Sequence, residues 1–194
     1  MANKTNKILA MRSVWDNKVP VVKTSKKLID IYIQEALGEP FFYNEMIHVL
    51  LTAKRGTTIV IHLNTPGGLL DSALRIVDAI HNSKAVVRAH LTGSVASAGT
   101  IIALACDELE IVKHTQFMIH NYSGGAGGKG HEIKARIEFS DAELNKAFSI
   151  LYKDFLSPSE MASVIAGSDM WMNSKNVSKR WKKVLKGRNA NITV

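Results

Sequence analysis

The feature that most limits the fold is an alternation of strand-like and helix-like segments in the first half of the chain. Residues 57–63 are β-branched and almost continuously apolar, which is typical of a buried strand. Residues 69–83 place apolar side chains at helical spacing, and residues 85–91 form a second β-branched run. Strand, helix and strand in this order predict an α/β fold, with a parallel sheet flanked by helices.

The alternation continues on both sides of this unit. Alternating residues 27–33 predict a strand, residues 41–54 a helix, and residues 109–112 and 116–120 two short strands. In parallel sheets the functional groups gather at the carboxyl ends of the strands. The 194 residues suffice for one core, and no linker divides them, so we expect a single domain over 1–194.

Glycine dominates the segment that follows these strands. Residues 124–130 contain five glycines, which indicates a flexible loop or an extended segment close to other backbone. A long helix is expected over residues 131–155. Ser157-Pro158-Ser159-Glu160 then has the pattern of a capping box that opens a short helix.

Composition narrows the class of protein. The chain is 46% hydrophobic and 22% charged, and no apolar run approaches the ~20 residues of a membrane span. The apolar patch after the first residues is too short for a signal-peptide core. Cys106, the only cysteine, lies in an apolar run and is expected to be buried. A cytoplasmic protein without a membrane partner fits these features.

The ends of the chain are basic. Residues 1–25 are polar and without clear periodicity, so we interpret them as an N-terminal arm. The net charge is +8, and no acidic residue follows Asp169. We interpret residues 179–194 as a solvated basic tail. A nucleic-acid partner is therefore not expected, although a tail of this kind could contact nucleic acid or an acidic protein.

The stretch Gly93-Ser94-Val95-Ala96-Ser97-Ala98-Gly99 is the main candidate for chemistry. It is a run of small residues between a predicted strand and a compact apolar helix. Such a turn presents a side chain at a helix start, where backbone N–H groups lack partners. Ser94 and Ser97 both qualify as a nucleophile, and a serine at this position is often only a helix N-cap.

A serine nucleophile needs a base, an acid that orients the base, and donors for the oxyanion. His120, at the end of a predicted strand, is the candidate base, and Asp169 is the candidate acid. Backbone N–H groups of Gly68 and Ala98 could stabilise the oxyanion. Six other histidines compete for the role of base: His48, His62, His81, His90, His114 and His131. Such chemistry needs no cofactor, and we find no metal-ligand spacing.

The order of these motifs resembles the ClpP family, the proteolytic subunits of the ATP-dependent Clp protease (peptidase family S14). Four elements carry the resemblance, over about residues 28–178: Asn64-Thr65-Pro66-Gly67-Gly68, the Gly93–Gly99 stretch, Met118-Ile119-His120 with the glycine-rich segment after it, and Asp169. The resemblance favours Ser97 over Ser94. It implies a serine endopeptidase with the triad Ser97, His120 and Asp169.

The resemblance also implies an architecture and partners. The fold would be the ClpP/crotonase-like superhelix of ββα units. Residues 124–155 would form a projecting handle of glycine-rich strand and long helix. Subunits would form heptameric rings, single or stacked in pairs, around a chamber. An extended polypeptide substrate would lie along Gly67, Gly124 and Gly125. An AAA+ unfoldase would feed the chamber, and the subunit would need no cofactor.

The sequence departs from the family pattern at several positions. Ala98 stands where the family usually carries methionine, and Tyr122-Ser123 replaces the usual Gln-Pro. These departures indicate a divergent member, of cellular or phage origin. Three alternatives stay open: a phage head-maturation protease of the same fold, an acyl-CoA enzyme of the same superfold, and a non-catalytic scaffold or nucleic-acid binder that uses the basic tail.

Overall fold

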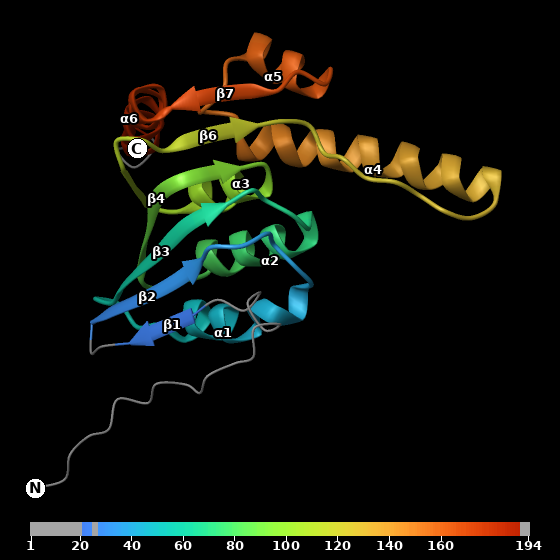
Figure 1. Cartoon of the computed structure of the whole chain (residues 1–194). Helices are drawn as coiled ribbons and strands as arrows, with labels where there is room; N and C mark the ends of the chain where they lie inside the picture. Colours follow the sequence, from blue (N-terminus) through green and yellow to red (C-terminus); the bar gives the residue numbers. More distant parts are fainter. Residues whose placement is uncertain (1–20, 25–26, 191–194) are drawn as a thin grey trace, which may run out of the picture.

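The computed structural model describes residues 21–24 and 27–190 and contains a seven-stranded mixed sheet with helices packed on it (Figure 1). The strands are β1 (Val21–Thr24), β2 (Leu28–Ile33), β3 (Thr58–Thr65), β4 (Val86–Ala96), β5 (Glu108–Ile111), β6 (Gln116–Ile119) and β7 (Met170–Asn173). The helices are the 3-10 turn η2 (Pro40–Tyr43), α1 (Asn44–Thr52), α2 (Leu70–His81), α3 (Ala98–Ala105), α4 (Gly130–Leu151), α5 (Pro158–Ile165) and α6 (Ser174–Ala190).

The sheet has a parallel centre and antiparallel edges. Its order is β1-β2-β3-β4-β6-β7, and β5 pairs with β4 beside this path. Strands β2 to β6 pair in parallel, whereas β1 and β7 run antiparallel to their neighbours. The predicted α/β class and the parallel core are confirmed. β1 falls within the segment expected to be an arm, and the remainder of residues 1–25 lies outside the described residues.

The core fills the space between the sheet and α1, α2 and α3, which Figure 1 shows on the same face. The side chains of β3 that point to this face, Ile59, Ile61 and Leu63, are fully buried. Every residue of α3 is buried, which explains why its sequence is apolar on all sides. No helix among the described residues combines the length and apolar character needed to cross a bilayer.

Strand β4 extends further than the sequence indicates, because it changes neighbours along its length. Residues 88–91 pair with β5, and residues 94–96 pair with β6. Gly93, with φ of +57°, lies between the two halves. The side chain of Asn64 accepts a hydrogen bond from the Ser94 N–H at 3.0 Å. The stretch expected to be a turn is therefore strand up to Ala96, and the turn is confined to Ser97.

The long helix α4 lies apart from the core over much of its length. Figure 1 shows its first half and the glycine-rich segment before it extending away from the sheet. Phe148 is its one buried residue, while Phe139 and Ile150 are 70% and 75% exposed. The structure assigns no strand to residues 121–127, so a strand there stays a prediction that requires pairing with a second chain.

The basic C-terminal segment differs from the expected solvated tail. Residues 174–190 form α6, which buries Val177, Trp181 and Val184 against the core. The guanidinium of Arg180 forms two hydrogen bonds, of 2.6 and 2.9 Å, with the carboxylate of Glu160 in α5. The sequence places these three apolar residues at helical spacing, but the surrounding lysines obscure the pattern.

The Glu160–Arg180 pair makes the docking of α6 sensitive to acid. The hydrogen bonds from Arg180, followed by that from the Ser157 N–H, lower the pKa of Glu160 from 4.5 to about 2. Because the folded-state pKa is lowered, the pair stabilises the fold above about pH 4.5, and this contribution is lost as the pH falls towards 2.

Candidate active site

Ser97 lies between the end of β4 and the start of α3, in a strained backbone conformation. Its φ of 52° and ψ of −129° make it the one non-glycine residue with positive φ among the described residues. Such a conformation costs about 1–3 kcal/mol and is found most often at functional sites. Its backbone is fixed on both sides, because its N–H donates to the carbonyl of Met118 at 2.8 Å and its carbonyl accepts from the Thr100 N–H at 2.9 Å.

The hydroxyl of Ser97 contacts His120 and does not cap the helix. Although Ser97 occupies the N-cap position of α3, its side chain forms no capping hydrogen bond. Its Oγ lies 2.6 Å from Nε2 of His120, which follows β6 directly. β4 and β6 are parallel neighbours, so their carboxyl ends bring these two residues together. Ser94, the competing serine, lies within β4.

The competing histidines occupy other parts of the molecule. His62 and His90 pair with each other across β3 and β4, with 3.0 Å between their Nδ1 atoms. Nε2 of His62 also contacts Asp30 Oδ1 at 2.8 Å, and its ring stacks on Tyr32. The four remaining histidines are exposed on α1, α2, α4 and the loop after β5: His48, His81, His131 and His114.

The pairing of β6 with β7 places Asp169 near His120, but the two side chains form no hydrogen bond. It is exposed and directly precedes β7. β6 and β7 pair antiparallel with Ile119 opposite Met170, so one further step places His120 opposite Asp169. No hydrogen bond between these two side chains occurs in the described chain. The structure thus unites Ser97 with His120 and leaves Asp169 beside them.

The Gly67-Gly68 turn contacts Ser97 through Gly67. A Cβ on Gly67 would lie 2.6 Å from Ser97 Cβ and 3.0 Å from the Ala98 nitrogen, so the turn packs directly on the serine. The Gly67 carbonyl accepts from the Leu37 N–H at 2.6 Å, and the Leu37 carbonyl accepts from the Leu69 N–H at 2.9 Å. These two hydrogen bonds form an isolated parallel bridge between Leu37 and Gly68, and the N–H of Gly68 takes part in neither of them.

The Ala98 amide is the second candidate donor for an oxyanion. Ala98 is the first residue of α3, where a backbone N–H has no intrahelical acceptor. The partial positive charge of the helix N-terminus adds to its attraction for an anion. The neighbouring Gly67 N–H is engaged, because it donates to Thr65 Oγ1 at 3.1 Å. The assignment of Gly68 and Ala98 as the two oxyanion donors stays a prediction.

Side-chain hydrogen bonds fix the start of the glycine-rich segment after His120, and the glycines that follow are exposed. The Asn121 side-chain amide donates to the carbonyl of Ile165 at 2.9 Å. The Tyr122 hydroxyl donates to the carboxylate of Asp141 in α4, and this hydrogen bond raises the pKa of Tyr122. Gly124 and Gly125 are exposed, and a Cβ on either would meet nothing within 4 Å.

The Tyr122–Asp141 contact was not foreseen from the sequence. The two residues are 19 positions apart, with the glycine-rich segment and the start of α4 between them. No local sequence pattern links residues across such a loop. The unusual tyrosine at position 122 was the one sequence feature that pointed to this contact.

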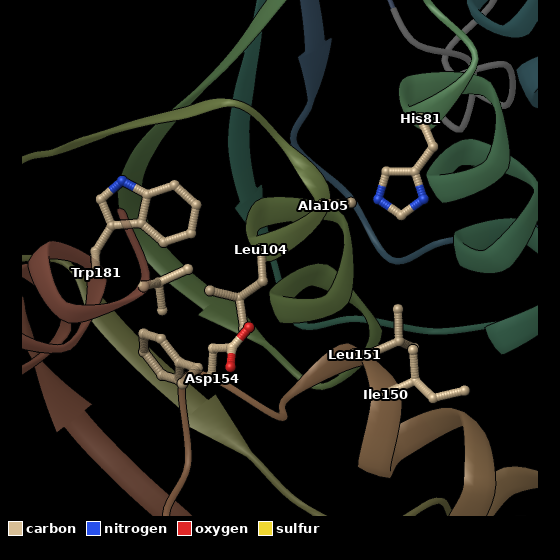
Figure 2. A pocket seen from close by; sticks show the side chains of 9 residues that line it. His81, Leu104, Ala105, Ile150, Leu151, Asp154 and Trp181 are labelled. Carbon is tan, nitrogen blue, oxygen red and sulfur yellow. The ribbon is translucent and has the colours of Figure 1, made fainter. Parts of the chain in front are cut away.

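A cavity of about 120 Å³ lies away from this site, among α2, α3, α4 and α6 (Figure 2). None of the candidate site residues lines it. Figure 2 shows Trp181 and Asp154 on one side and His81 on the other. The lining is His81, Leu104, Ala105, Ile150, Leu151, Asp154, Phe155, Trp181 and Val184. Most of these residues pack the helices together, so we interpret the cavity as a gap in helix packing.

The sequence matches known proteins over the region that builds the site. The family described as Clp protease matches residues 20–180. The chain is 32% identical, over 121 residues, to the ATP-dependent Clp protease proteolytic subunits of Streptococcus thermophilus and Streptococcus suis, and 31% identical to that of Streptococcus salivarius. Each alignment covers 60% of this chain and 62% of the relative's length. The chain belongs to the Clp protease family, as a divergent member.

Proposed function

We propose that the chain is a serine endopeptidase of the Clp type, with Ser97 as nucleophile, His120 as base and Asp169 as the acid that orients His120. The 2.6 Å contact between Ser97 Oγ and His120 Nε2, at a strained strand-to-helix turn, carries this proposal. A serine held only by its backbone needs no such conformation, whereas a nucleophile must present its oxygen to a substrate.

The proposed reaction follows the arrangement of the side chains. His120 Nε2 takes the proton of Ser97 Oγ as the oxygen attacks the peptide carbonyl. The oxyanion of the tetrahedral intermediate lies between the N–H groups of Gly68 and Ala98. His120 then gives the proton to the leaving amine, and an acyl ester on Ser97 remains. Water then attacks this ester. His120 Nε2 takes a proton from the water and gives one to Ser97 Oγ, which releases the carboxylic acid product.

The glycine-rich segment is the proposed binding site for an extended polypeptide. Its backbone groups at residues 123–127 belong to no strand, and the glycines leave room for a second backbone to approach. Addition of the substrate as a strand would place its carbonyl groups in register with Ser97. Gly67, which packs on Ser97, would border the same site. The Tyr122–Asp141 contact would fix the start of this segment.

The nucleophile can be identified with a fluorophosphonate probe. Wild-type protein should be labelled on Ser97, because His120 activates its hydroxyl. The Ser97→Ala variant should not be labelled, while Ser94→Ala, a matched change three residues earlier in the same stretch, should keep the label. Equal labelling of wild type and Ser97→Ala would contradict the proposal.

We also propose that subunits assemble into heptameric rings, single or stacked in pairs, and that an AAA+ unfoldase supplies substrate. The relatives' names describe proteolytic subunits of an ATP-dependent protease. Exposed apolar side chains on α4, among them Ile137, Phe139 and Ile150, support the assembly because they leave apolar area without a partner in the single chain.

Native mass spectrometry tests the assembly. We expect a mass of seven or fourteen subunits of 21.3 kDa. The Phe139→Glu variant should reduce the assembled fraction, because it would bury a charge in the contact. A matched change at an exposed alanine of the same helix, Ala142→Glu, should have a smaller effect, because alanine offers only a methyl group to the contact. A mass of one subunit for the wild type would contradict the proposal.

A further inference from the structure

Nearly all of the net charge of the chain resides in α6. This helix contains seven of the 25 Lys and Arg residues and no acidic residue. The other parts of the chain carry 18 basic and 17 acidic residues, a net charge of +1 against +8 for the whole chain. The excess positive charge is therefore a property of one helix, and this helix packs on the protein core.

Five lysines of α6 form a stripe along one face. At 100° per residue, they fall within an arc of about 100°, and they extend about 16 Å along the helix axis. The buried residues Val177, Trp181 and Val184 project in the opposite direction. All five lysines are exposed, and none takes part in an ion pair with a described residue. The lysine stripe consists of Lys175, Lys179, Lys182, Lys183 and Lys186.

The ion pair that α6 forms with α5 does not involve the stripe. Glu160 of α5 pairs with Arg180, which lies outside the stripe. The apolar face of α6 is already buried, so the helix cannot insert that face into a membrane surface. The stripe includes no aromatic or apolar side chain, and lysine is depleted at protein–protein interfaces. These features favour a partner recognised by negative charge alone.

We propose that the lysine stripe binds the phosphate backbone of double-stranded DNA without sequence preference. A basic stripe along one helix is the electrostatic pattern of nucleic-acid binding, and lysines contact phosphates as point charges. A duplex carries one negative charge per about 1.7 Å of its axis, so a straight stripe meets phosphates along its whole length. Without aromatic side chains the stripe cannot stack on unpaired bases, which disfavours single strands.

The salt dependence of binding tests this proposal quantitatively. The full-length protein is titrated into a fluorescein-labelled 20-bp DNA duplex of mixed sequence, and fluorescence polarisation is read at 50 to 200 mM KCl. If all five lysines contact phosphates, the logarithm of the binding constant falls with log[KCl] at a slope of about −4.5. The affinity then drops roughly 500-fold over this range.

A triple substitution on the stripe should remove most of this dependence. In Lys179→Gln/Lys182→Gln/Lys186→Gln, the magnitude of the slope should fall by about 2.7, because each lost phosphate contact removes about 0.9. Glutamine keeps the helix propensity, and the buried face is unchanged. The matched control is Lys27→Gln/Lys54→Gln/Lys84→Gln, three exposed lysines outside α6, which should bind like the wild type.

Several outcomes would overturn the assignment. Binding by the stripe variant at wild-type strength, or equal weakening in the control variant, would show that α6 is not the binding face. Displacement of the duplex by poly-glutamate at equal charge concentration would assign the stripe to acidic proteins. Tighter binding to a single strand of the same length would exclude the duplex. In an assembled ring one duplex could contact the stripes of several subunits, which would change the absolute slope. The deciding measurement is therefore the difference in slope between the stripe variant and the control variant.

Discussion

Replacing Asp169 with asparagine is expected to slow peptide hydrolysis by about 10⁴-fold, although no hydrogen bond joins Asp169 to His120 in the single chain. In the proposed reaction a carboxylate accepts the Nδ1–H of His120, which keeps Nε2 free to take the serine proton. An asparagine amide would donate a hydrogen bond to Nδ1 and favour the wrong tautomer of the ring. The hydrogen bond between Ser97 and His120 would then have the wrong direction.

Asp169 lies where its carboxylate can reach His120 after a side-chain rotation. The pairing of Ile119 with Met170 places Asp169 opposite His120 at the ends of two bonded strands. The side chain is exposed, so a rotation meets little steric resistance. The contact can therefore form when substrate or a neighbouring subunit fixes this edge of the sheet.

The measurement is kcat for a fluorogenic peptide, together with the native mass of each variant. Asp78→Asn, which changes an exposed acid on α2, is the matched control and should retain the wild-type rate. If Asp169→Asn also retained it, Ser97 and His120 would act as a pair without the acid. A lower native mass for Asp169→Asn would instead assign the loss to assembly.

The fold was predictable where local patterns and packing agree. β3 forms from the apolar run over residues 57–63, and α2 forms from the helical spacing over residues 69–83. Both predictions are confirmed, because each element packs apolar side chains into the same core. β7 was missed because four residues, Met170–Asn173, are too few for a periodic pattern. α6 was missed because its lysines obscure three apolar residues at helical spacing.

The candidate site was predictable in its residues and less so in its geometry. Ser97 and His120 were chosen by motif order, and the structure brings them within hydrogen-bond distance. The sequence could not indicate that β4 changes neighbours at Gly93, since that depends on which strands pair with it. The contact between Tyr122 and Asp141 likewise depends on how the segment before α4 folds back.

Replacing Gly67 with alanine is expected to reduce kcat by 10²-fold or more and to destabilise the fold by about 2–4 kcal/mol. The φ of Gly67 is +96°, a conformation that costs an L-residue about 1–2 kcal/mol. The added Cβ would also lie 2.6 Å from Ser97 Cβ and 2.8 Å from the Ala96 carbonyl. No flexible side chain can move away there, so the turn or the serine must shift, which adds a cost of overpacking.

The loss of rate follows from the same displacement. A shift of about 1 Å in a reacting group can cost 10²-fold in rate, and Gly67 also positions the amide of Gly68. Hydrolysis of the peptide and the urea midpoint of unfolding are measured together. Gly187→Ala is the matched control, because Gly187 lies in α6, has no positive φ, and its Cβ would meet nothing within 4 Å. If Gly67→Ala kept both values, the Gly67 turn would not be packed against Ser97. If only the rate fell, the turn would yield to the methyl group at little cost in stability, and the displaced oxyanion donors would account for the lost activity.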